Sequence, residues 1–145
     1  MKTKNIFTLV LASILLLSLI SCSKDSKLGK PKIILTEVGH DNGKVAMRGD
    51  DMHLEADITA EALIKSIHVE IHQEGGSFEI EKEYTSGKYI GVKNTEFHEH
   101  IDIPSTAPLG EYHLHFTVTD QKGRQATAEA QIRVIEYDPN QHHDD

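Results

Sequence analysis

Thiols and indoles are nearly absent from this chain of 145 residues, which holds one cysteine, Cys22, and no tryptophan. A single cysteine cannot close a disulfide within the chain, and it leaves too few thiolates for an iron–sulfur cluster or a cysteine-ligated zinc site. Without tryptophan, only Tyr84, Tyr89 and Tyr137 are candidates for an exposed aromatic platform. Stability must therefore come from an apolar core, and binding of glycans by stacking is disfavoured.

Motifs for enzymatic catalysis are also missing from the sequence. It contains no nucleophile motif and no glycine-rich loop of the kind that cradles phosphate. The nearest approach to a zinc-protease motif is His68-Val-Glu-Ile-His72, in which the glutamate sits one position later than His-Glu-x-x-His requires. A hydrolytic zinc site would also need a nearby base, and the spacing of Glu70 and Glu99 singles out neither. The sequence therefore predicts a protein that is not an enzyme.

Positive charge is in short supply, with 15 lysine and arginine residues against 23 aspartate and glutamate residues. Removal of residues 1–22 would take away Lys2 and Lys4 and no acidic residue, so the net charge becomes 13 − 23 = −10 with neutral histidines. A domain with this charge repels phosphate backbones, which argues against nucleic acid as a partner, and it attracts cations.

The amino-terminal segment has the layout of a secretory signal peptide. Two lysines precede an uncharged apolar run, residues 6–20, that is short for a membrane span. The run leads into Leu19-Ile-Ser-Cys22, which resembles the lipobox of bacterial lipoproteins and so implies a signal peptide of residues 1–22 and a lipid on Cys22. Residues 23–30 are polar and predict a flexible tether. We expect an outer membrane lipoprotein of the cell envelope, held to the membrane by its lipid. The sequence does not decide whether it faces the periplasm or the cell surface.

The strongest structural pattern is residues 111–120, where Tyr112, Leu114, Phe116 and Val118 alternate with histidine and threonine. Strict alternation predicts a half-buried β-strand. A loop rich in proline and glycine precedes it and a turn at residues 120–123 follows it. A tyrosine at the entrance of such a strand is typical of the tyrosine corner of immunoglobulin-like sandwiches.

Further strands are predicted wherever the same period of two recurs. Residues 64–73 also fit a helical repeat, but their β-branched residues favour a strand. A loop at residues 85–93 is expected to cover one sheet edge. The sequence thus predicts an all-β, immunoglobulin-like antiparallel β-sandwich of about seven strands and no disulfide over residues 31–136, followed by a disordered tail, 137–145. The expected strands are 32–37, 52–60, 64–73, 78–84, 95–103, 112–119 and 127–135, with a short edge segment at 45–47.

Ten histidines are present, an enrichment that composition does not explain. Antiparallel connectivity brings the start or end of several strands to one pole of the sandwich, where their outward histidines meet. Imidazoles without thiolates, supported by carboxylates such as Glu70, Glu96 or Asp102, suit Zn²⁺, Cu²⁺ or Ni²⁺. The expected metal ligands are His53, His72, His98, His100, His113 and His115, with His40 as an accessory.

One shared site and two separate sites both remain open at this point. Outward residues of the two sheets lie on opposite faces, roughly 10 Å or more apart, so a single ion could be reached only through rim residues. The same histidines beside carboxylates would also change the surface charge between about pH 5 and 8 and make partner binding pH-dependent.

Several segments together resemble an uncharacterised, domain-of-unknown-function family of Gram-negative lipoproteins with a histidine-rich Ig-like domain. They include Gly49-Asp-Asp-Met-His53, His98-Glu-His-Ile-Asp-Ile-Pro104 and Gly110-Glu-Tyr-His-Leu-His-Phe116. The resemblance spans nearly the whole chain after residue 22. It implies lipoprotein status and fold, and adds no activity.

Two functions follow as hypotheses. The first is a lipid-anchored binding protein that captures a divalent transition metal for an outer-membrane uptake system, with a receptor or transporter as partner. The second is a structural or adhesive module that binds another envelope protein or a glycan through its sheet faces.

Overall fold

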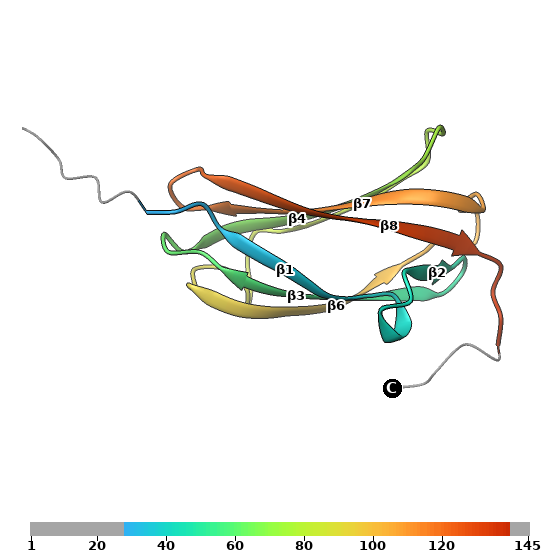
Figure 1. The fold of residues 1–145 in the computed structure, drawn as a ribbon, viewed down its shortest axis with the longest axis horizontal. Helices are drawn as coiled ribbons and strands as arrows, with labels where there is room; N and C mark the ends of the chain where they lie inside the picture. The colour runs from blue at the N-terminus through green and yellow to red at the C-terminus, as the bar shows by residue number, and fades with distance from the viewer. Residues whose placement is uncertain (1–27, 140–145) are drawn as a thin grey trace, which may run out of the picture.

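A computed structural model describes residues 28–139. Within this range the chain forms eight strands and one short 3₁₀ helix, arranged as two packed sheets (Figure 1). The predicted signal peptide, Cys22, most of the tether and the end of the tail lie outside the described residues. The elements are β1 (Lys32–Val38), η1 (His40–Asn42), β2 (Val45–Met47), β3 (Asp51–Thr59), β4 (Ile64–Gln73), β5 (Glu79–Tyr84), β6 (Asn94–Asp102), β7 (Gly110–Asp120) and β8 (Gln125–Ile135).

One sheet has the order β1-β3-β6 and the other has the order β2-β8-β7-β4-β5. Neighbouring strands are antiparallel except β2, which pairs with β8 in parallel. Because β1 and β2 belong to different sheets, the chain crosses from the three-stranded to the five-stranded sheet between them. The predicted all-β, immunoglobulin-like sandwich is confirmed, and the segment expected at 45–47 is an edge strand of the larger sheet. None of the helical segments between residues 28 and 139 has the length and apolar character needed to cross a membrane.

The core forms where the inward residues of the two sheets meet. On β7 the four predicted apolar residues are completely buried. Phe116 packs edge-on against Phe97 of β6, with ring centroids 4.9 Å apart. Burying an aromatic side chain of this size contributes about 1.5–3 kcal/mol. The Tyr112 hydroxyl donates to the Pro108 carbonyl oxygen at 2.8 Å, so the tyrosine corner is also confirmed.

The turn between β7 and β8 is organised by the buried carboxylate of Asp120. It accepts hydrogen bonds from the backbone of Lys122 and Arg124, at 2.8 and 3.0 Å, and from Arg124 Nε at 2.8 Å. Burial raises the pKa of Asp120, but the bonds from Arg124 and Lys122 outweigh it and leave the pKa below its ordinary value. Arg124 also donates to the Leu28 carbonyl, which ties the start of the domain to this turn.

The loop of residues 85–93 covers the outer edge of β6, as expected. Tyr89 is only 3% exposed, and its hydroxyl lies 2.7 Å from the carbonyl oxygen and 3.2 Å from the amide nitrogen of His98. These backbone groups face away from β3, the neighbour of β6 in its sheet. The hydroxyl also lies 2.6 Å from Glu99 Oε1, which gives this inward glutamate a polar partner. Burial and the bond to Glu99 raise the pKa of Tyr89.

Candidate metal centre

Three histidines gather on the outer face of the three-stranded sheet. Met52 and Leu54 of β3 are buried, so His53 between them points outward. The antiparallel register of β3 and β6 places His53 opposite His100 and Glu55 opposite His98. Four side chains of types that can bind a metal ion therefore form one patch on two adjacent strands.

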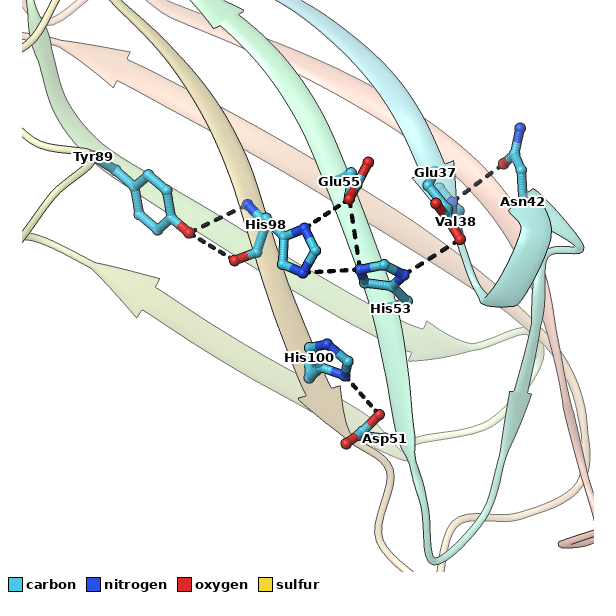
Figure 2. Close-up of polar contacts among 9 residues, drawn as sticks. All are labelled: Glu37, Val38, Asn42, Asp51, His53, Glu55, Tyr89, His98 and His100. Atoms are coloured by element: carbon cyan, nitrogen blue, oxygen red, sulfur yellow. Dashed lines mark hydrogen bonds and ion pairs between the residues drawn. The ribbon is translucent and has the colours of Figure 1, made fainter. Parts of the chain in front are cut away.

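The imidazoles of this patch are close enough to share an ion. Nε2 of His53 lies 3.1 Å from Nε2 of His98, and the His53 ring stacks on that of His100 with centroids 4.8 Å apart (Figure 2). One nitrogen from each of the three rings falls within 4.8 Å of the others. Two nitrogens bound to one tetrahedral ion at 2.0–2.1 Å lie about 3.3 Å apart. The first pair already has this spacing.

Each of the three rings is held by a carboxylate at Nδ1. Glu37 Oε1 lies 3.3 Å from His53 Nδ1, Glu55 Oε1 lies 2.7 Å from His98 Nδ1, and Asp51 Oδ1 lies 3.0 Å from His100 Nδ1 (Figure 2). A carboxylate accepts the Nδ1 proton, which leaves the Nε2 lone pair for a metal ion. Such partners are typical of metal-binding histidines in proteins.

His53 is the centre of the arrangement. It also belongs to a second possible ligand set with Glu37 and Glu55, again within 4.8 Å. Its side chain is 15% exposed, whereas His98 and His100 are 48% and 46% exposed. An ion here would have one half-buried ligand below it and two exposed ligands beside it.

The other predicted histidines do not reach this patch. Three of them lie on the opposite side of the molecule, and His40 lies apart from these and from the patch. His72 of β4 faces His113 of β7 in register, and His115 lies one pleat farther along β7, all on the outer face of the five-stranded sheet. His40 lies in η1, where its Nε2 contacts Asp41 at 3.2 Å. The structure thus divides the six principal histidines into two groups of three on opposite faces, because both sheets turn their alternate apolar residues inward.

The supporting carboxylates were predicted less well than the histidines. Glu70 does contact His72, at 3.2 Å, but Asp102 pairs with Lys82 instead. Glu37, Asp51 and Glu55 were missed. Glu55 follows His53 by two residues on the same face, so alternation alone would have found it. Glu37 and Asp51 need the pairing of β1, β3 and β6, which the sequence does not display.

Comparison with known proteins places the chain in a family. Residues 20–135 match the family described as "Domain of unknown function (DUF4625)". The chain belongs to this family. No curated protein matches it.

Solved structures resemble the fold. Wild-type OgpA from Akkermansia muciniphila aligns with a TM-score of 0.53 at 14% identity, over 72% of this chain and 29% of that chain. Catalytically inactive OgpA from the same organism, in complex with an O-glycopeptide substrate, aligns over the same shares with a TM-score of 0.52 and 14% identity. The chain spans 29% of the OgpA length, and at this identity the likeness shows the fold alone.

Proposed function

We propose that this protein is a lipid-anchored protein of the cell envelope that captures a divalent transition metal ion through His53, His98 and His100. The observation that carries the proposal is the 3.1 Å approach of two Nε2 atoms whose Nδ1 atoms both face carboxylates. Without a shared ligand or proton, two imidazole lone pairs at this distance repel each other.

The donor set defines the class of ion. Imidazole nitrogens with nearby carboxylate oxygens suit Zn²⁺, Cu²⁺ and Ni²⁺, and are poor ligands for Ca²⁺ or Mg²⁺. Three neutral imidazoles fill three positions of a tetrahedral ion and leave the fourth for a ligand from outside the patch. Glu37, Asp51 and Glu55 supply three negative charges beside the ion, one more than the ion's two positive charges, so the patch attracts a divalent cation.

Exposure of the ligands favours capture and transfer. His98 and His100 stand on the open face of the sheet, nearly half exposed, so a partner's ligand can reach the ion without unfolding the domain. A lipid on Cys22 would hold the domain near the membrane, where an outer-membrane receptor or transporter is the expected partner. The uptake role rests on this reasoning and on the signal-peptide pattern of the sequence.

The adhesive alternative receives less support. Its aromatic platform would use Tyr84, Tyr89 and Tyr137. Tyr89 is buried beside β6, and Tyr84 packs edge-on against Phe97 with centroids 5.2 Å apart. The rings of Tyr84 and Tyr89 therefore pack in or against the core and do not form an exposed platform.

Calorimetric titration with Zn²⁺, Cu²⁺ and Ni²⁺ tests the proposal. The protein should begin at residue 23 and carry H142Q and H143Q, so that tail histidines do not contribute. At least one ion should bind, and the double variant H53Q/H98Q should lose one bound ion per chain. His68→Gln is the matched control, because His68 is also an outward histidine but belongs to neither group. Unchanged binding in H53Q/H98Q would refute the proposed site.

A further inference from the structure

The outer face of the five-stranded sheet carries a second imidazole group. His72 and His113 are direct cross-strand partners, and Glu70 is the partner of His115. Four metal-ligating side chains again occupy a two-by-two patch on adjacent antiparallel strands. None of them belongs to the site proposed above.

Two of the three ring pairs in this group have the centroid spacing of imidazoles bound to one ion. The His72 centroid lies 5.5 Å from that of His113 and 5.0 Å from that of His115. With a metal–nitrogen bond of 2.0–2.1 Å, two imidazoles on a tetrahedral ion have centroids about 5 Å apart. His72, which takes part in both pairs, is the central ligand.

Carboxylates surround these rings as they do on the other face. Glu70 Oε1 lies 3.2 Å from His72 Nδ1, and Glu129 Oε1 lies 3.2 Å from His115 Nδ1, so both rings keep Nε2 for an ion. Glu74 Oε2 lies 3.8 Å from His113 Nε2, which leaves Nδ1 of that ring. Three carboxylates beside three imidazoles give the patch the negative charge that attracts a cation.

We infer that His72, His113 and His115, with Glu70, form a second binding site for a divalent transition metal ion. The two sites lie on opposite faces of the sandwich, separated by both sheets, so each ion binds without sharing a ligand with the other. This second site does not depend on the first.

The second site should be the weaker of the two. Among residues 28–139, the three rings of the His53 group bring one nitrogen each within 4.8 Å of the others, and the three rings of this second group do not. Its carboxylates are also more exposed, with Glu129 at 69% against 21% for Glu55. Side chains must therefore be ordered when the ion binds, which costs conformational entropy.

Zinc titration of single-face variants tests this inference. The chain from residue 23 with H142Q and H143Q should bind two Zn²⁺ ions, measured by calorimetry and by competition with a chromophoric chelator. H72Q should bind one ion, with the tighter step unchanged. H53Q/H98Q should also bind one ion, with the weaker step retained. H68Q, which alters another outward histidine of β4, should still bind two.

The failures of the two sites are distinguishable. If H72Q and the second variant H113Q/H115Q both bind two ions, the second site is refuted whatever H53Q/H98Q does. Suppose instead that sedimentation shows a dimer when metal is added, and that H72Q loses both this dimer and the weaker binding step. The ion then bridges two copies of the chain, and a site within one chain is refuted. Circular dichroism should show a folded β-sandwich for all metal-free variants, because every altered side chain lies on the outer face of a sheet and none belongs to the core.

Discussion

The Nε2 atoms of His53 and His98 face each other at 3.1 Å across the antiparallel pair β3 and β6. Nδ1 of each ring faces a carboxylate, Glu37 for His53 and Glu55 for His98. Without a proton or an ion between them, the two Nε2 lone pairs repel each other. A metal ion bound between the rings removes this repulsion.

Metal affinity at this site should fall by at least about tenfold when the pH is lowered from neutral to a range where histidines are protonated, since protons and metal compete for the same lone pairs. The H72Q variant isolates the site, and calorimetric titration at neutral and at acidic pH measures the change. An affinity that does not change with pH would contradict binding through imidazole nitrogens.

Glu55→Gln should weaken metal binding at the His53 site about 10–100-fold. The change removes the carboxylate that holds His98 Nδ1 at 2.7 Å and supplies charge to the ion, while keeping the side-chain volume. Glu96→Gln on β6 is the matched control, because Glu96 lies opposite Asp57 and outside the patch. Equal affinities for the two variants would show that Glu55 does not support the site.

Tyr89→Phe should lower the free energy of unfolding by about 1–2 kcal/mol. The hydroxyl contacts the backbone of His98 and the carboxylate of Glu99, and both partners lose a bond when it is removed. Chemical denaturation measures the change, with Glu96→Gln, an exposed change on β6, as the control. Because the bond fixes β6 at His98, metal affinity should fall as well; a fully stable variant would mean that the loop does not hold this edge.

Asp120→Asn should lower the free energy of unfolding by about 1–3 kcal/mol at pH 7. The pKa of Asp120 is lowered in the folded protein, so its stabilising contribution is complete above its ordinary value of 3.8. The contribution is lost as the pH falls below 3.8 through the lowered pKa. Thermal melts from pH 7 to pH 2 should therefore converge for wild type and variant at the acidic end. Asp57→Asn, an exposed change on β3, serves as the control. If the unfolding temperatures of wild type and Asp120→Asn differed by the same amount at every pH, the account would be contradicted.

Strand positions could be predicted from the sequence because apolar and polar residues alternate along each half-buried strand. The pattern on β7 identified both its buried face and its outward histidines, and Tyr112 identified its entrance. Glu99 was the exception, an inward charge on β6 whose partner, Tyr89, comes from a loop with no periodicity. Such a contact depends on where the loop folds, and local sequence does not specify that.

The grouping of the histidines depended on strand pairing. Outward orientation followed from alternation, but the sheet to which each strand belongs decides which histidines meet. His53 and His72 approach the same pole from different sheets and so belong to different groups. Glu37 reaches His53 only because β1 pairs with β3 with a shift in register between Leu35 and Glu37. No pattern within either strand encodes that shift.

The most direct measurement is an anomalous scattering map of crystals grown with Zn²⁺, recorded above and below the zinc absorption edge. The account predicts a zinc peak about 2.0–2.1 Å from Nε2 of both His53 and His98, with His100 as the third ligand. Absence of a zinc peak between these two rings, in crystals whose lattice leaves that face open, would contradict it.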